Sequence, residues 1–278
     1  CKELQAQVQE DCLPLPLFIA VDQEGGRIVR LQAPFTVPPA AADLGETCSP
    51  EEVYLWFSRI AEELKSVGIN MNLAPVLDIN TNPANPVIGD RSFGFDPQRV
   101  SLLGRAAIQA LQDHGIVSVG KHFPGHGDTY LDSHLALPKV DHSEERLRMV
   151  ELKPFQEAIV TGVSGIMTAH VVYNHLDPKH PATLSPRIIK EILRKELGFS
   201  RLVLSDDLEM KAIEHHYSLD RAAVLAVKAG VDILLICHSP EKQELVYRGL
   251  LKAIEEGEIS MGELDEAVTR ILKGKECL

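Results

Sequence analysis

The sequence predicts an α/β fold, a (β/α)8 TIM-type barrel that in this chain lacks its first two strands. Short apolar runs alternate with helical patterns along all 278 residues, and nearly every run ends on a polar or charged side chain. Buried runs that alternate with helices indicate parallel βα units. The six runs expected to form strands are residues 15–21, 70–77, 116–120, 165–169, 201–205 and 232–237.

Helices are expected between these runs, most of them with a recognisable start signal. Ser49, Pro50 and Glu52 combine an N-cap, a proline at the first helical position and a capping-box glutamate, so a helix is expected to run to about Val67. Glycines just beyond the apolar pattern are expected to stop three of the others. These other helices start at Asp96–Pro97, Ser185–Pro186, Ser218 and Ser260, and the stops are Gly115, Gly198 and Gly230.

The positions of the polar residues favour a closed barrel over an open doubly wound sheet. Because all strands of a barrel end on one rim, polar groups at strand ends converge there. No GxGxxG sequence follows a strand, which disfavours a dinucleotide-binding sheet. Six units are two fewer than eight, and the chain starts just ahead of a strand without a methionine, so two further strands are expected upstream. The strand-end residues are Asp22, Asp78, Lys121, His122, His170, Asp206 and His238.

Composition argues against several classes of function. The net charge is −12, from 40 acidic and 28 basic residues without a dense basic block, so nucleic acid is not an expected partner. Apolar stretches such as residues 231–237 are far shorter than the roughly 20 residues that cross a bilayer, so no membrane span is expected. Five scattered cysteines without a CxxC spacing indicate neither a disulfide framework nor a zinc site, and favour a cytoplasmic location.

Residues 121–134, with the sequence KHFPGHGDTYLDSH, form a candidate active-site loop. Asp132 and His134 are two positions apart, so in an extended segment their side chains point to the same side. The carboxylate could then orient the imidazole, which would make an acid/base pair. An alternative interpretation is a surface loop in which both side chains bond only to local backbone.

Asp206 and Asp207 follow the run 201–205 directly. A carboxylate at the end of a buried strand is costly unless it is compensated, and Asp206 there would be placed to attack a carbon electrophile. The competing interpretation is that both carboxylates cap a helix formed by the following LEMKAI segment.

A metal-dependent barrel hydrolase is a further interpretation, because the loop contains several groups that bind metals. The HxxxH and DxH spacings fall in a Pro/Gly-rich loop instead of on a helix face, which argues against this site. We therefore expect neither a metal nor a cofactor. The possible ligands are His122, His126, Asp128, Asp132 and His134.

Six motifs, in unbroken order from about Pro16 to Gly274, resemble glycoside hydrolase family 3 and are most similar to its β-N-acetylhexosaminidase branch. The resemblance implies a single barrel domain over residues 1–278, truncated at its N-terminus because the family normally has both early strands. The DSH element separates this branch from the β-glucosidases of the family. The motifs are VDQEGGR (21–27), APVLDI (74–79), GDRSFG (89–94), GKHFPGHGDT…DSH (120–134), AHVVY (169–173) and SDDLEM (205–210).

The resemblance also implies a role for each candidate residue. Asp206 would be the nucleophile, and His134 would be the acid/base assisted by Asp132. The implied activity is retaining hydrolysis of non-reducing terminal β-linked GlcNAc through a covalent glycosyl-aspartate, with peptidoglycan fragments such as muropeptides as the implied source. The positions that match the terminal-sugar site are Asp22, Arg30, Arg91, Lys121 and His122.

Three alternatives to this activity stay open at the level of sequence. A β-glucosidase or a glycoside phosphorylase of the same family would share the fold. A metal-dependent amide or ester hydrolase would use a different chemistry on a similar barrel. A fragment or binding module without activity would follow if the two absent strands were indispensable.

Overall fold

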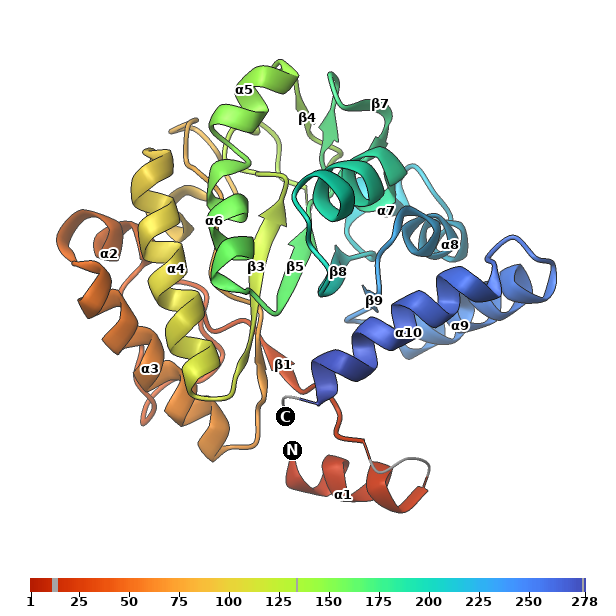
Figure 1. Ribbon diagram of the computed structural model, residues 1–278, viewed down its shortest axis with the longest axis horizontal. Coiled ribbons are helices and arrows are strands. Elements are labelled where there is room, and N and C mark those ends of the chain that lie inside the picture. The colour runs from red at the N-terminus through yellow and green to blue at the C-terminus, as the bar shows by residue number, and fades with distance from the viewer. Residues whose placement is uncertain (12–14, 134, 277) are drawn as a thin grey trace.

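The computed structural model describes residues 1–11, 15–133, 135–276 and 278. All six predicted strands are present and form one curled parallel sheet in chain order, with helices packed along it (Figure 1). The third and fifth of these strands are longer than the apolar runs that predicted them, and the other four are shorter. The strands are β1 (Ala20–Val21), β2 (Met71–Asn72), β3 (Val117–Phe123), β5 (Gly165–Thr168), β8 (Leu202–Asp207) and β9 (Ile233–Leu235).

The sheet differs from a closed barrel at its two edges. In the described part of the chain β1 pairs only with β2, and β9 pairs only with β8, so no ladder joins β9 back to β1. The architecture is therefore a curled, open half-barrel of the parallel α/β type. The expectation of two further strands stays a prediction.

Local signals predicted the helix starts well. Ser49 and Ser260 each accept a hydrogen bond from the backbone of the glutamate three residues later, and both capping boxes are complete. Asp96 accepts from the backbone N–H groups of Gln98 and Arg99. The helices are α1 (Lys2–Asp11), α2 (Ala41–Thr47), α3 (Pro50–Ser66), η1 (Gly89–Arg91), α4 (Pro97–Asp113), α5 (Glu144–Met149), α6 (Lys153–Thr161), η2 (Ala182–Leu184), η3 (Arg187–Glu196), α7 (Lys211–Glu214), α8 (Leu219–Ala229), α9 (Pro240–Glu255) and α10 (Met261–Lys275).

Two helices deviate from the simplest expectation. The helix predicted after Ser185–Pro186 is η3, which is wound as a π-helix and stops ahead of Gly198, where φ is 72°. Ser218 precedes α8, yet its side chain makes no capping hydrogen bond. Gly230 ends α8 in the left-handed conformation, as its position predicted.

The core divides by the two faces of the sheet. Alternate strand residues point to opposite faces. One set packs against the surrounding helices in two large apolar clusters, and the other set fills the concave face, where Ile271 of α10 joins it. The concave-face residues are Met71, Leu73, Val117, Val119, Met167, Leu202 and Leu204.

A second, three-stranded sheet lies beyond the carboxyl ends of β3 and β5 (Figure 1). Its strands are β4 (Lys139–Val140), β6 (Val172–Tyr173) and β7 (Asp177–Pro181), with β6 in the centre. No helix among the described residues is long and apolar enough to cross a membrane.

Candidate active site

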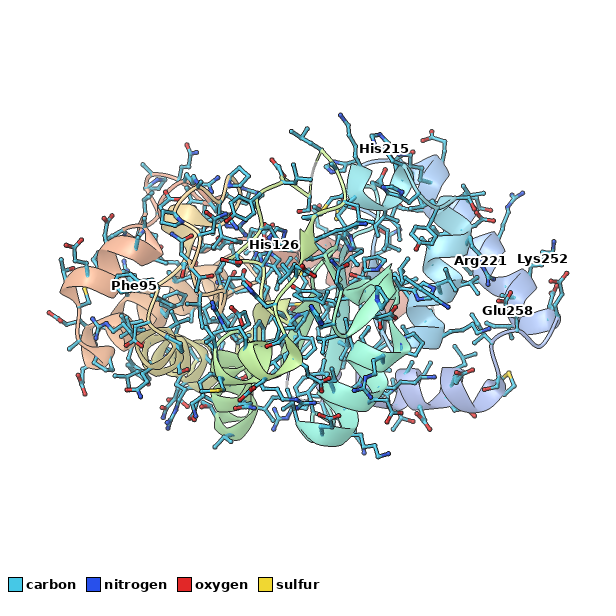
Figure 2. All side chains as sticks on the ribbon, turned by 90° about the horizontal axis from the view of Figure 1, so that it is seen from above. Phe95, His126, His215, Arg221, Lys252 and Glu258 are labelled. Carbon is cyan, nitrogen blue, oxygen red and sulfur yellow. The ribbon has the colours of Figure 1, made fainter. Side chains whose placement is uncertain are left out.

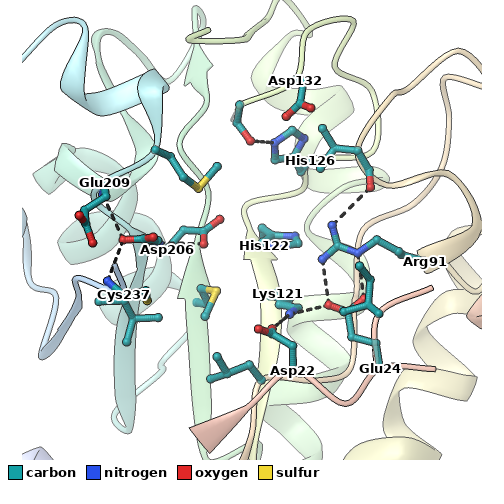
Figure 3. A pocket seen from close by; sticks show the side chains of 18 of the residues that line it. Asp22, Glu24, Arg91, Lys121, His122, His126, Asp132, Asp206, Glu209 and Cys237 are labelled. Atoms are coloured by element: carbon teal, nitrogen blue, oxygen red, sulfur yellow. Dashed lines mark hydrogen bonds and ion pairs between the residues drawn. The ribbon is translucent and has the colours of Figure 1, made fainter. Parts of the chain in front are cut away.

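A pocket of about 710 Å³ opens at the carboxyl ends of the parallel strands. The strand pattern explains why charged groups enter it. Lys121 continues the inward row of Val117 and Val119, and Asp206 continues the inward row of Leu202 and Leu204. Both side chains therefore reach the pocket from the concave face (Figure 3), and Met167 is one of the apolar residues that line it.

Asp206 is held as a carboxylate in the pocket wall. Its Oδ1 accepts a hydrogen bond of 2.8 Å from the backbone N–H of Asp207. Burial raises its pKa, but the neighbouring His122 and His170, together with that hydrogen bond, outweigh burial and lower the pKa below the usual range. The side chain points toward His122 across the pocket (Figure 3). An ionised carboxylate at this place is chemically able to act as a nucleophile.

Asp207 ties the end of β8 to the turn that follows β9. Its Oδ1 accepts from the backbone N–H groups of Glu209 and Cys237, and its Oδ2 lies 3.1 Å from Nε2 of His238. Helix α7 starts after Met210 without any side-chain cap. The interpretation of both carboxylates as helix caps is therefore wrong.

Lys121 is the centre of a buried ion-pair network. Its Nζ lies 2.7 Å from Asp22 and 2.6 Å from Glu24, and Glu24 accepts two hydrogen bonds from Arg91, of 2.8 and 2.9 Å (Figure 3). Burial raises the pKa of Glu24, but Lys121 and Arg91 outweigh it and lower the pKa to about 2. The network therefore presents fixed charges with little freedom to reorganise, which suits a ligand with several hydroxyl groups.

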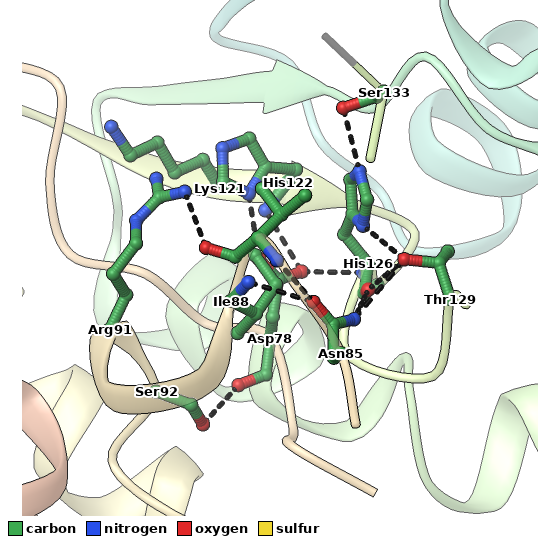
Figure 4. Close-up of polar contacts among 12 residues, drawn as sticks. Asp78, Asn85, Ile88, Arg91, Ser92, Lys121, His122, His126, Thr129 and Ser133 are labelled. Carbon is green, nitrogen blue, oxygen red and sulfur yellow. Dashed lines mark hydrogen bonds and ion pairs between the residues drawn. The ribbon is translucent and has the colours of Figure 1, made fainter. Parts of the chain in front are cut away.

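His122 has a defined orientation because of Asp78. The carboxylate of Asp78 is fully buried, and its Oδ2 lies 2.7 Å from Nδ1 of His122 (Figure 4). Burial raises the pKa of Asp78, but its contacts with His122 and with the backbone N–H of His126 outweigh burial and lower the pKa below the usual range. An ionised carboxylate can only accept, so Nδ1 carries a proton and Nε2 is left for the pocket.

Further candidate residues extend this pocket. Arg30, with its side chain 55% exposed, lies 3.7 Å from Asp22. Asp132 lines the pocket, whereas His134 lies outside the described residues, so the predicted acid/base pair stays a prediction. The candidates that share this one pocket are Asp22, Arg30, Arg91, Lys121, His122, Asp132 and Asp206.

Several supporting residues were not predicted as part of the site. Glu24 lies within the VDQEGGR motif, and Asp78 was expected on the rim as a strand-end residue, but neither was predicted to hold a side chain of the sugar site in place. His126 and His170 are buried, and burial lowers the pKa of each, to about 4 for His126. Seen from above, His126 lies near the centre of the molecule (Figure 2).

The loop after β3 packs against a neighbouring strand end without space for side chains. A Cβ on Gly127 would lie 1.7 Å from the backbone oxygen of Ile79, so only glycine fits there. Further along the loop, Asp132 and Ser133 line the pocket. Within the described ranges, no group of three or more His, Cys, Asp or Glu side chains is arranged to hold a metal ion.

The fold and pocket together define an α/β domain of the parallel barrel type, with a charged site at the carboxyl ends of its strands. Residues 1–273 match the sequence model of the glycosyl hydrolase family 3 N terminal domain. The chain belongs to this family.

Individual relatives agree with that assignment. The chain is 37% identical to a beta-hexosaminidase A of Pseudoalteromonas piscicida, over 98% of this chain and 49% of the relative. It is 41% identical to a beta-hexosaminidase of Nitrosomonas eutropha, over 84% and 69%. The solved structure of a family 3 beta-N-acetylglucosaminidase from a Paenibacillus species superposes with a TM-score of 0.97 at 47% identity, over 99% of this chain and 52% of that one. The chain thus spans about half the length of the Pseudoalteromonas and Paenibacillus proteins.

Proposed function

We propose that this chain acts as a retaining β-N-acetylhexosaminidase that removes non-reducing terminal β-linked GlcNAc. The observation that carries the proposal is the ionised carboxylate of Asp206 in a pocket of fixed charges, on a chain whose relatives are named beta-hexosaminidases. Asp22, Arg30, Arg91, Lys121 and His122 bind the terminal sugar. Peptidoglycan fragments such as muropeptides supply the substrate, in the cytoplasm; the described cysteines are free, which suits that compartment.

In the first chemical step, Asp206 attacks the anomeric carbon, and the glycosidic oxygen takes a proton as it departs. His134, assisted by Asp132, supplies that proton as an imidazolium. The neutral imidazole then takes a proton from water, and the resulting hydroxide opens the glycosyl-aspartate ester with net retention. A histidine avoids the repulsion that a second carboxylate would cause beside Asp206.

Asp206→Asn tests the nucleophile. We expect turnover of the 4-nitrophenyl β-GlcNAc glycoside to fall by at least about 1,000-fold, because the amide cannot form the ester. Incubation with a slowly released fluorinated GlcNAc donor should add one glycosyl unit to the wild-type mass and none to the variant. Loss of activity without a labelled wild-type protein would contradict the covalent route.

The choice of substrate distinguishes the proposed activity from that of a β-glucosidase or a glycoside phosphorylase of the same family. The same assay with the 4-nitrophenyl β-glucoside, and with and without inorganic phosphate, is expected to show GlcNAc-selective and phosphate-independent turnover. Faster turnover of the glucoside, or phosphate-dependent release, would replace the proposal by a β-glucosidase or a phosphorylase. Loss of activity with a chelator would indicate the metal-dependent alternative.

A further inference from the structure

Ser133 is the residue between the two members of the predicted acid/base pair. Hydrogen bonds to two different segments of the chain hold it in place. Its hydroxyl Oγ lies 3.1 Å from Nε2 of His126, in the loop after β3 (Figure 4). Its carbonyl oxygen accepts a hydrogen bond of 3.2 Å from the backbone N–H of Ala212, in α7. Ser133 is 2% exposed. The segment around Asp132 is thus tied both to the start of the loop after β3 and to α7, which follows β8.

His126 is itself held in place before it reaches Ser133. Its backbone N–H donates to Oδ1 of Asp78 at 2.7 Å, the carboxylate that also orients His122. Its Nδ1 lies 2.9 Å from the hydroxyl of Thr129, and Thr129 accepts a hydrogen bond of 3.1 Å from Asn85 (Figure 4). The imidazole therefore cannot rotate without breaking bonds at both nitrogens.

The direction of these bonds depends on the charge of His126. Burial and the adjacent His122 lower its pKa to about 4, so the ring is neutral near neutral pH. A neutral imidazole has one donor and one acceptor nitrogen. One of the two hydroxyls, Thr129 or Ser133, thus donates to the ring and the other accepts from it, and neither ring nitrogen is left without a partner.

We propose that His126 and Ser133 are positioning residues, whose hydrogen bond anchors the loop so that Asp132 faces the pocket and the departing oxygen is protonated from this segment. The inference rests on the proposed glycosidase activity. It follows from geometry, because the bond joins the buried His126, in the loop that follows β3, to the residue next to Asp132, and Asp132 lines the same pocket as Asp206. Neither residue needs to touch the reacting atoms for this role.

Ser133→Ala, in the complete 278-residue chain, tests the role in protonation. Proton donation contributes about 100- to 10,000-fold to such reactions, and only poor leaving groups need it. We expect kcat/KM to fall about 10- to 100-fold for the phenyl β-GlcNAc glycoside and less than about 3-fold for the 2,4-dinitrophenyl one. Equal losses on both glycosides, or no loss on either, would overturn the proposal.

Thr129, which contacts His126, allows a matched pair of variants. Thr129→Val removes the hydroxyl that holds Nδ1 of His126 at nearly constant volume, whereas Thr129→Ser keeps it. The valine variant should show the same dependence on the leaving group as Ser133→Ala, and the serine variant should behave as the wild type. Identical behaviour of the two variants would contradict the relay through His126.

Amide hydrogen exchange tests the anchor independently of turnover. Ser133→Ala should accelerate exchange about 10-fold or more at Leu135, Ala136 and Ala212, with the amides of β3 unchanged. Unchanged exchange in the loop would overturn the anchor, whatever the kinetics. If wild-type protein turns over no glycoside while Ser133→Ala still loosens the loop, the anchor holds and the proposed activity fails.

Discussion

At the scale of single residues, the pocket shows how one environment assigns different charge states to neighbouring groups. Lys121 and Arg91 keep Glu24 ionised, with a pKa of about 2, in a site that would otherwise favour its neutral form. In the loop after β3, burial keeps His126 neutral near neutral pH, with a pKa of about 4. The difference follows from partners: Glu24 has two cations in contact, whereas His126 has only hydroxyl groups at its ring nitrogens.

His126 is expected to make stability depend on pH in a defined window. Its folded pKa of about 4 lies below its ordinary value of 6.5, so between these values the unfolded chain binds a proton that the folded chain does not. Stability therefore falls as pH drops through the window, by on the order of 3 kcal/mol for this group. Urea unfolding across the window should show a smaller decline in His126→Gln than in wild type.

The buried His170 also contributes to the loss of stability at low pH. Burial lowers its pKa as well, so the variant should keep part of the decline with falling pH. If His126→Gln and wild type lose stability in parallel throughout the window, the ring of His126 is not the neutral buried group described here.

At the scale of elements, one buried carboxylate joins three parts of the fold at the amino ends of the strands. Asp232, whose side chain has no exposure, accepts from Arg194 of η3 at 2.7 Å and from Arg270 of α10 at 2.8 Å. It also accepts from the backbone N–H of Val203 in β8. This contact lies opposite the pocket, where polar residues serve the fold and not the chemistry.

Asp232→Ala should destabilise the chain by about 3 to 5 kcal/mol, because it removes a fully buried carboxylate and leaves two partly buried guanidinium groups without their partner. Glu244→Ala is the matched control, since its pair with Arg248 lies within one exposed helix turn, and it should change stability by less than about 0.5 kcal/mol. Both values come from urea midpoints measured at constant pH. Similar midpoints for the two variants would show that the contact of Asp232 does not stabilise the packing of η3, α10 and β8.

At the scale of the whole molecule, the described residues share one continuous framework. The six-stranded sheet runs without interruption from β1 to β9, and α4 packs against both α3 and α6 across the two large core clusters. Surface ion pairs such as Arg221–Glu258 lie at the periphery, far from His126 (Figure 2). A shared sheet and shared helices favour cooperative unfolding over independent halves.

We therefore expect a single unfolding transition. The chain has one tryptophan, Trp56 in α3, which reports on the N-terminal half, whereas far-ultraviolet circular dichroism reports on all helices. The urea midpoints from the two signals should coincide. Separate midpoints, or no cooperative transition, would contradict this framework and support the alternative of a fragment without activity.

The order of the six strands in the main sheet, most of the helix starts and seven of the charged residues that line the pocket were predictable from the sequence, whereas the three-stranded sheet was not. Apolar runs, capping residues such as Ser49 and Asp96, and polar groups that directly follow an apolar run are patterns of neighbouring residues, so the sequence contains them. The resemblance of the motifs then indicated the family. The match of residues 1–273 to the sequence model of that family confirms it.

Other features depended on contacts between residues distant in sequence. Glu24 meets Arg91 across 67 positions and Asp78 meets His122 across 44, so their protonation could not be deduced from either segment alone. Whether Asp207 caps a helix or fastens Cys237 depended on how β8 and β9 lie together. The open edges of the sheet were likewise decided in three dimensions, because strand pairing is a long-range property that local patterns do not contain.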